Sequence, residues 1–469
     1  MTTTSIARTR SRSLAGARPG WANLPQGWQP YAIFVGLPVW WLLGLSFFMW
    51  PLITLPLVYP MFRRGELRVP RRFGIWLVFL AWMFASGVEL QSASRAIAWS
   101  WRLSFYLSAT VLFLYIYNSS RERLPTRTII NALAAYWVIV IAGGWIGVLF
   151  PTIAFASPAE AVFPHSLLNN TYFYAHVHLQ FAEVQRFLGF QEGRPQTFFA
   201  YTNAWGSTCA MLTPVCLAAL AAGPGRIWGR VLKVTLALSV IPIVFSLNRG
   251  LWLSLGIGLA YAAVRFGALR DTRRVMRVLG AVVVVGALVA VSPLGGLVTA
   301  RFSHQTGDTS RLARDRAAQS QIAASPLLGY GAPQQAVGVT HTSKSVGTES
   351  ELFLLLYSHG VPALFLFGGF MAYTIVRTAK QRSRSSPALF WIHVALIVAC
   401  VQAPYYELTE RMPLMLAFAA LLYRDIAIQS DLRYVERTRD RLRAWARRGP
   451  APAQAALDKI GRASCRERV

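Results

Sequence analysis

Apolar runs of about 20 residues, separated by short basic segments, follow one another along most of the chain. A run of this length crosses the hydrocarbon core of a bilayer as a single α-helix. The pattern therefore predicts an all-α, polytopic membrane domain with about twelve spans between residues 31 and 425. The spans are expected at 31–62 (two spans), 73–90, 99–117, 128–150, 203–222, 231–247, 250–266, 278–291, 352–376, 389–402 and 412–423.

Two long polar segments interrupt the apolar pattern, at residues 151–202 and 292–350. The other connections are short, and many of them carry clusters of arginine, such as the one at 63–72. Loops rich in Lys and Arg stay on the cytoplasmic side of a membrane. We therefore expect both long segments to be extracytoplasmic loops, whereas the basic tails at 1–30 and 426–459 are expected to be cytoplasmic.

The composition is typical of a membrane protein and explains the basic charge without nucleic acid. Hydrophobic residues make up 54% of the 469 residues and charged residues only 14%, a balance that few soluble domains show. The net charge is +28, but the Lys and Arg residues lie in blocks between apolar runs, where they orient helices and contact anionic lipids. Membrane lipids are therefore predicted partners, and nucleic acid is excluded.

The four cysteines do not indicate a disulfide framework or a metal site. Cys209, Cys216 and Cys400 lie in predicted spans without ligand spacing, where a thiol is a small apolar group. Cys465 lies in the stretch Ile460–Val469, which resembles a translated sequencing adapter. We expect this stretch to be foreign to the natural protein, whose own carboxyl terminus would then be missing.

Three arginines depart from the charge pattern because they lie in parts predicted to be outside. Arg194 precedes the sixth predicted span, Arg249 opens the eighth, and Arg311 lies in the longer polar segment. The guanidinium fork suits phosphate oxygens. We expect these pieces to meet on the outer face and to bind a lipid-linked diphosphate. For any single arginine, an interfacial snorkel or a lipid-headgroup contact is the simpler alternative.

Two side chains before the span at 352–376 are candidates for acid–base chemistry. A carboxylate such as Glu349, at the membrane edge near arginines, is able to deprotonate a sugar hydroxyl. His341 is a weaker candidate, because loop histidines are usually solvated. Glu351 fits a capping box in which Thr348 is the helix N-cap, and this structural explanation does not extend to Glu349.

The first polar segment gives weaker signals. A surface helix is predicted at 173–188, and it contains His176 and His178. No third ligand at metal spacing accompanies these histidines, so we predict no metal site there.

Four short motifs, in a fixed order, resemble the O-antigen ligase and polymerase superfamily. The clearest is Ser246–Trp252, which is similar to the Ser/Thr-x-Ser-Arg-Gly-x-Trp helix start of that family. The best match covers about residues 231–376, which would form the core of the membrane domain. The other motifs are Gly193–Asn203 (Arg…Pro-Asn), Arg311 with Ala317–Gly331 (Arg…Ala…Pro-Leu-x-Gly-x-Gly) and Gly347–Val361 (the closing helix).

The resemblance implies a family C glycosyltransferase-like membrane fold and an enzyme of the cytoplasmic membrane. It implies that a glycan is transferred or polymerised, with inversion and without a metal or other cofactor, at the outer face. The donor would be linked to undecaprenyl diphosphate, and the acceptor would be a hydroxyl of a glycan, lipid or protein. Arg194 and Arg249 would bind the diphosphate, with Arg311 in support. Glu349 occupies the position of the family's histidine. Either Glu349 or His341, eight residues upstream, would then act as the base beside Arg249, or this member would be inactive or differently specialised.

Two other functions fit parts of the pattern. A transporter or flippase for a polysaccharide or a lipid-linked precursor has a similar number of spans, but the sequence shows no convincing inverted repeat and few mid-membrane charges. A membrane scaffold or sensor would not need the outside arginines. Among enzymes, ligase and polymerase remain alternatives, because they share the fold, the donor and the arginines and differ in the acceptor.

Overall fold

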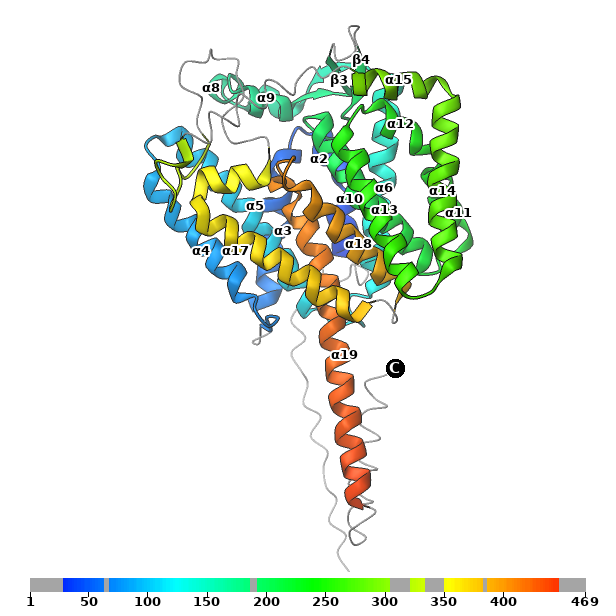
Figure 1. Ribbon diagram of the computed structural model, residues 1–469. Helices are drawn as coiled ribbons and strands as arrows, with labels where there is room; N and C mark the ends of the chain where they lie inside the picture. Colours follow the sequence, from blue (N-terminus) through cyan, green and yellow to red (C-terminus); the bar gives the residue numbers. More distant parts are fainter. Residues whose placement is uncertain are drawn as a thin grey trace, which may run out of the picture.

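The structure, a computed structural model, describes residues 28–62, 67–185, 192–303, 321–333, 350–382 and 386–446. Long helices pack side by side, and two small sheets with several short helices cover one end of the bundle (Figure 1). The helices are α1 (Trp28–Val35), α2 (Leu37–Leu42), α3 (Met49–Phe62), α4 (Gly74–Ala85), α5 (Ala93–Asn118), α6 (Thr126–Leu149), α7 (Pro158–Val162), α8 (His165–Leu168), α9 (Thr171–Val177), α10 (Thr202–Ala221), α11 (Arg226–Leu238), α12 (Val240–Phe245), α13 (Arg249–Ala268), α14 (Thr272–Val291), α15 (Pro293–Ser303), α17 (Glu351–Arg382), α18 (Pro387–Gln402) and α19 (Met412–Ala446), with 3-10 turns η2 (Ser46–Phe48), η3 (Ser86–Glu89) and η4 (Thr409–Arg411).

The chain is a mostly helical, polytopic membrane protein. Among the described residues, eight helices are long and apolar enough to cross a bilayer, and three shorter apolar helices accompany them. Helical structure is found in every predicted span, and the span predicted at 231–247 consists of α11 followed by α12. The total of twelve crossings stays a prediction.

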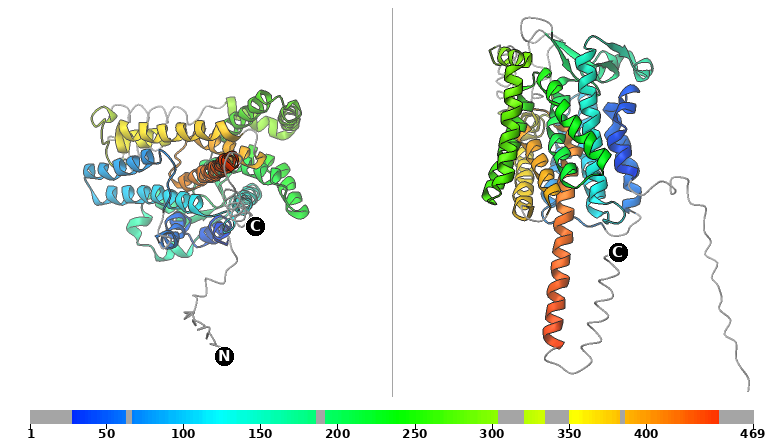
Figure 2. Two further views of the ribbon diagram at one scale, coloured as in Figure 1. Left: turned by 90° about the horizontal axis from the view of Figure 1, so that it is seen from below. Right: turned by 90° about the vertical axis from the view of Figure 1, so that its right-hand side faces the viewer.

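Arginines gather at one end of the bundle, which we call the basic end. Arg121, just before α6, pairs with Asp425 of α19 at 2.5 Å. Arg265 of α13 donates a hydrogen bond to the Ala379 carbonyl of α17 at 3.0 Å. From this end α19 continues beyond the other helices (Figures 1 and 2). The grouping of basic connections at one end agrees with the alternation expected from their charge.

Both long polar segments contribute to the opposite end, at the top of Figure 1, which we call the polar end. The first segment forms α7, α8, α9 and two antiparallel pairs of strands, and the second contributes α15. The strand β1 (Ala154–Ala156) pairs with β2 (His178–Gln180), and β3 (Ala182–Gln185) pairs with β4 (Glu192–Pro195). The polar end therefore combines chain segments that are far apart in sequence.

The prediction of a surface helix at 173–188 is wrong beyond Val177. The helix α9 ends at Val177, and the chain continues as β2 and β3. From His178 the side chains alternate between half-buried and buried, with Leu179 only 1% exposed, and this is the period of a strand. Pairing with β1 satisfies the backbone there. At the start of the second polar segment, which was predicted to be a loop, the chain forms the helix α15.

A loop of the second polar segment completes a break in α17. Gly360 has a φ of 75°, a left-handed conformation that interrupts the helix. The turn at Ser325–Ala332 lies against this break, where the Val361 N–H donates to the Pro326 carbonyl at 2.8 Å. A Cβ atom at Gly360 would collide with the Leu327 carbonyl oxygen. The turn thus pairs backbone groups that the broken helix leaves open.

The helices differ strongly in how much of their surface the protein covers. The first turns of α19 are buried at the centre, against α5 and α18. In contrast, α14 contains no buried residue, and Val282 to Val285 are exposed. A hydrophobic helix with this exposure is expected to face lipid.

Candidate functional site

A sharp turn at the polar end connects α12 with α13. Leu247 has a φ of 50°, which is uncommon for a residue other than glycine. Asn248 is the N-cap of α13, and its Oδ1 accepts a hydrogen bond from the Leu251 N–H at 3.2 Å. The helix therefore begins at Arg249, in agreement with the prediction that the Ser246–Trp252 motif opens a helix. A helix start offers unpaired N–H groups and the positive end of a dipole, both of which favour anions.

Two buried arginines from different polar segments bind this turn. Arg194 donates from Nε to the Ser246 carbonyl at 2.7 Å, and Arg301 donates from Nε to the Leu247 carbonyl at 3.2 Å. The two arginines are only 5% and 7% exposed. Because Arg249 begins the adjoining helix, three positive charges converge on one short stretch of chain. We call Arg194, Arg301 and the turn at 246–249 the arginine turn.

The sheet and α10 hold Arg194 in place. Arg194 lies in β4 opposite Glu183 of β3. The Thr202 hydroxyl, at the start of α10, donates to the Arg194 carbonyl at 3.2 Å, and the Thr202 N–H donates to Glu183 Oε2 at 3.2 Å. The first polar segment is thus fixed to the bundle at the point where it delivers Arg194.

The structure brings together some of the predicted site residues and adds one. The structure places Arg194 against the turn that leads into Arg249. The turn at Ser325–Ala332, which contains the predicted Pro-Leu-x-Gly-x-Gly motif, packs against α17. Its Leu327 carbonyl accepts a hydrogen bond from Trp82 Nε1 of α4. Arg301 was not predicted, because its position over the turn depends on the fold of α15. The predicted site residues Arg311, His341 and Glu349 lie outside the described residues.

A second turn links the arginine turn with the start of α17. We call residues 403–411, between α18 and α19, the α18–α19 turn. The Tyr406 hydroxyl donates to Asn248 Oδ1, and the Tyr406 carbonyl accepts a hydrogen bond from the Glu351 N–H at 2.8 Å. The turn therefore contacts the first residues of both α13 and α17.

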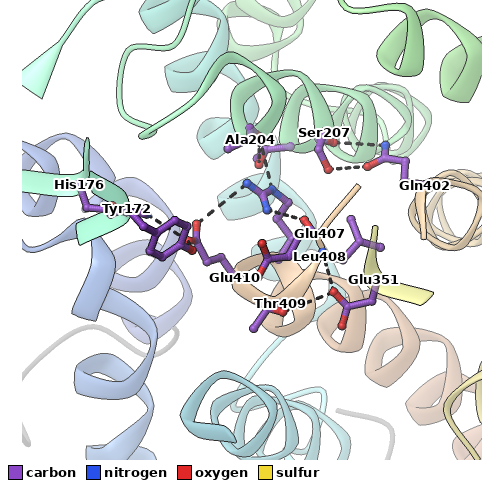
Figure 3. Close-up of polar contacts among 12 residues, drawn as sticks. Tyr172, His176, Ala204, Ser207, Glu351, Gln402, Glu407, Leu408, Thr409 and Glu410 are labelled. Atoms are coloured by element: carbon purple, nitrogen blue, oxygen red, sulfur yellow. Dashed lines mark hydrogen bonds and ion pairs between the residues drawn. The ribbon is translucent and has the colours of Figure 1, made fainter. Parts of the chain in front are cut away.

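Glu351 is a buried carboxylate with a structural role (Figure 3). It is fully buried, and its Oε2 accepts hydrogen bonds from the Leu408 N–H at 2.7 Å and from the Thr409 hydroxyl at 3.4 Å. The Tyr106 hydroxyl donates to its Oε1. Both carboxylate oxygens are thus used to join α17 to α5 and to the α18–α19 turn.

The capping box predicted with Thr348 as N-cap is wrong for Glu351, because α17 begins at Glu351 and its carboxylate binds Tyr106, Leu408 and Thr409. Thr348 itself lies outside the described residues. Ser350 takes the capping role, and its hydroxyl oxygen accepts a hydrogen bond from the Phe353 N–H at 3.1 Å.

Glu410 joins the first polar segment to the centre of the bundle (Figure 3). Its Oε1 accepts a hydrogen bond from the Tyr172 hydroxyl at 2.7 Å and lies 3.1 Å from His176 Nε2. His176 Nδ1 lies 2.8 Å from the Tyr172 carbonyl, an acceptor, so this nitrogen carries a hydrogen. One further proton is then shared between Nε2 and the carboxylate. Burial, and next the charges of Glu410 and Glu407, raise the pKa of Tyr172, so its hydroxyl stays protonated as a donor.

Glu407 is placed differently from the other two carboxylates. It faces Arg102 of α5, whose Nε lies 3.6 Å from Glu407 Oε1, beyond hydrogen-bond distance. The Glu407 and Arg102 side chains are 20% and 12% exposed. Burial raises the pKa of the Glu407 carboxyl above its ordinary value, although Arg102 acts in the opposite direction. Glu407 therefore combines an accessible carboxylate with a low-dielectric environment.

A pocket of about 40 Å³ lies beside Glu410, and it offers room for about three water molecules. His176, Glu410 and Arg411 form part of its wall, and aromatic rings such as Trp50 and Tyr136 form much of the rest. The volume is too small for a sugar ring, so we do not assign the donor or acceptor glycan to it. Across the parts of the chain that the structure describes, no group of three or more His, Cys, Asp or Glu residues is arranged to hold a metal ion.

Comparison with known protein families identifies one matching segment. Residues 234–368 match the family described as O-antigen ligase. This segment begins in α11, includes Arg249 and Arg301, and ends in α17. Arg194 and the α18–α19 turn lie outside it. No curated protein matches the chain. Residues 234–368 of this polytopic membrane protein are therefore similar to the O-antigen ligase family, in agreement with the resemblance of the sequence motifs.

Proposed function

We propose that the protein is a membrane glycosyltransferase that uses an undecaprenyl-diphosphate-linked glycan as its donor. It transfers or polymerises this glycan onto a hydroxyl of a glycan, lipid or protein acceptor. The arginine turn is the observation that carries the proposal, because it collects three cationic side chains at one end of a membrane bundle. Most of it lies in the segment related to O-antigen ligases. Such a site suits a ligand that has two phosphates and a lipid tail.

The arginines act on the leaving diphosphate. Arg194 and Arg249 bind its oxygens, and Arg311 of the second polar segment supports them. Negative charge on the diphosphate grows as the bond to the anomeric carbon breaks, and prepositioned cations stabilise that charge. The loss of one such contact costs about 2.7–4 kcal/mol in the transition state, or roughly 100- to 1,000-fold in rate. Buried hydrogen bonds hold Arg194 in position before the donor binds.

The acceptor hydroxyl attacks the anomeric carbon from the side opposite the diphosphate, so the configuration is inverted and no metal takes part. A base near the arginine turn removes the hydroxyl proton. The sequence suggests Glu349 and His341 for this role, and both residues precede α17, whose first residue contacts the α18–α19 turn. The acceptor therefore approaches from the polar end.

The proposed orientation places the polar end outside the cytoplasmic membrane and the basic end in the cytoplasm. The basic connections, including Arg121 and Arg265, lie at one end, as the positive-inside rule requires. Both polar segments lie at the other end, where an exported lipid-linked donor would be presented (Figure 2). Both chain termini would then be cytoplasmic.

The test is the cell-surface glycan of a deletion strain complemented with the wild type, Arg249→Ala or Arg274→Ala. Arg274 is a suitable control because it is half-exposed and pairs with Asp271 away from the polar end. We expect the wild type and the control to restore the glycan. Arg249→Ala should reach the membrane at a normal level but leave the donor unused on the outer face.

Each outcome has a distinct meaning. Normal glycan with Arg249→Ala contradicts the role of the arginine turn. Donor that accumulates on the inner face indicates a flippase instead of a transferase. Short glycans that are still attached to their acceptor indicate a polymerase, whereas long glycans that remain on the lipid carrier indicate a ligase.

A further inference from the structure

Three buried or half-buried carboxylates lie in the α18–α19 turn and at the start of α17, and only one of them accepts no hydrogen bond from the described residues. We infer that Glu407 is the general base that takes the proton from the acceptor hydroxyl. This inference rests on the glycosyl transfer proposed above and assigns one role within it. Glu407 would act in place of Glu349 or His341.

The other two carboxylates are occupied by structural contacts. Glu351 accepts hydrogen bonds from Tyr106, Leu408 and Thr409, and it is fully buried. Glu410 is held by the Tyr172 hydroxyl and by His176. Moving either carboxylate towards a substrate would break contacts that join helices.

Among the described residues, no hydrogen bond comparable to these holds the Glu407 carboxylate. Within the described part of the chain, its carboxylate makes only the 3.6 Å ion pair with Arg102. Arg102 Nε is buried and has no hydrogen-bond partner among the described residues, so the pair is electrostatic and leaves the oxygens of Glu407 open. One fifth of the Glu407 side chain remains exposed. An acceptor hydroxyl is therefore able to reach it without a rearrangement of helices.

Glu407 lies in the turn that joins the two parts of the proposed site, next to a residue that contacts both of them. It directly follows Tyr406, whose hydroxyl bonds to Asn248, the cap of the helix that begins at Arg249. The Tyr406 carbonyl also accepts the Glu351 N–H at 2.8 Å. Glu349, which takes the place of the family's histidine, precedes Glu351 by two residues. The α18–α19 turn that carries Glu407 therefore contacts both the arginine turn and the start of α17.

The charges around Glu407 suit a base that must gain and lose a proton. The positive groups that face it are Arg102 of α5, Arg411 of η4 and His176 of α9, and the negative ones are Glu410 and Glu351. The hydroxyls of Tyr106, Tyr172 and Tyr201 are also within its electrostatic reach. Burial outweighs the positive groups and raises the pKa of Glu407. A carboxylate with a raised pKa is a stronger base than a solvated one.

Glu407 accepts the proton of the acceptor hydroxyl, and the freed oxygen lone pair forms a bond to the anomeric carbon of the donor. The bond between that carbon and the diphosphate oxygen breaks, and its electron pair leaves with undecaprenyl diphosphate beside Arg249. The proton on Glu407 then passes to solvent through the exposed side of the carboxyl group.

The full chain in lipid nanodiscs provides the test. Donor is extracted from the deletion strain, and binding is measured separately with undecaprenyl diphosphate. For Glu407→Gln we expect transfer to fall by about 100-fold or more, while the protein stays folded at the assay pH and undecaprenyl diphosphate binding is unchanged. Glu407→Asp should recover part of the rate. Glu122→Gln, at an exposed position by the basic end, is the matched control and should behave as the wild type.

The pH dependence separates a base from a structural residue. The wild-type rate should rise with pH as one carboxyl ionises, and this rise should disappear in Glu407→Gln. The inference is overturned if Glu407→Gln transfers at the wild-type rate while Glu349→Gln or His341→Ala does not. It is also overturned if Glu407→Gln loses undecaprenyl diphosphate binding together with transfer. A wild type that neither binds undecaprenyl diphosphate nor forms product contradicts the proposed function itself.

Discussion

Arg194 and Arg301 come from two different polar segments and donate hydrogen bonds to neighbouring carbonyl oxygens of one turn. Their targets, Ser246 and Leu247, immediately precede the cap of α13. The turn therefore depends on both segments at once, and each segment is fixed to the membrane helices through it. Since a buried guanidinium is costly without hydrogen-bond acceptors, the carbonyls stabilise the arginines as much as the arginines stabilise the turn.

Removal of Arg301 should weaken the site although the residue was not predicted from sequence. Arg301→Ala deletes a hydrogen bond from a charged donor, which contributes about 1.5–3 kcal/mol to the stability of the turn. We expect transfer by the purified protein in nanodiscs to fall because the turn that carries Arg249 is less firmly held. Arg274→Ala removes an exposed ion pair and should change transfer little. Equal rates for the two variants would contradict the role of Arg301.

Arg249 should distinguish a diphosphate from a monophosphate. Arginine binds paired phosphate oxygens in a bidentate manner, so Arg249→Ala should weaken binding of undecaprenyl diphosphate more than that of undecaprenyl phosphate. Arg249→Lys keeps the charge without the fork and should fall between the wild type and Arg249→Ala. Binding to nanodisc-embedded protein measures the difference. If both lipids lose affinity equally, Arg249 contributes charge alone.

Gly360 should be intolerant of a side chain. Gly360→Ala places a Cβ on a left-handed residue and against the Leu327 carbonyl, and we expect a loss of more than about 1 kcal/mol in stability. Gly368, in the same helix, has open space around its Cα, so Gly368→Ala should be neutral or slightly stabilising. Thermal unfolding in detergent compares the two. Equal melting temperatures would show that the contact at Gly360 is not required.

The contacts of Glu410 should secure the first polar segment. Glu410→Ala leaves His176 and Tyr172 without their shared acceptor and should cost about 3–5 kcal/mol locally, as for a broken buried pair. Tyr172→Phe removes one hydrogen bond and should cost about 1 kcal/mol. Protease cleavage within residues 151–202 is the measurement. Cleavage should be fastest in Glu410→Ala, and the reverse order would contradict the assignment.

Glu407 should also affect stability as a function of pH. Burial raises its pKa above the ordinary value of 4.5, so the folded protein resists the ionisation that the unfolded chain undergoes freely. Stability conferred by the protonated form is therefore present below pH 4.5 and declines as the pH rises towards the folded pKa. Glu407→Gln mimics the neutral form and should reduce this decline. Melting temperatures across acidic pH measure it, and parallel curves for the two proteins would contradict the raised pKa.

Local sequence patterns predicted the helices and part of the site. Apolar length placed a helix in each expected span, and the Ser246–Trp252 motif identified the start of α13 at Arg249. The charge pattern singled out Arg194, which the fold brings to the same turn. These predictions succeeded because each depends on residues close together in the chain, or on a single charge in an unexpected place.

The remaining features depend on contacts between distant segments. Arg301 becomes important only when α15 lies over the turn, and one more arginine in a basic chain gives no signal of that. Glu407 lies in a connection of ordinary length, and its environment comes from Arg102 on another helix. Glu351 matched a capping pattern, but Tyr106 and Leu408 compete successfully for its carboxylate. These competing partners lie far from Glu351 in the sequence, so no local pattern reveals them.

The break in α17 has a consequence for the order of synthesis. The partners that close it, in the turn at Ser325–Ala332, are translated just before α17, and Trp82 of α4, which donates to the His359 carbonyl, is translated much earlier. Every group that pairs with the backbone at the break is therefore already made when the second half of α17 leaves the ribosome. The break is able to close during membrane insertion, whereas the start of α17 gains its partners Ala403 and Tyr406 only later.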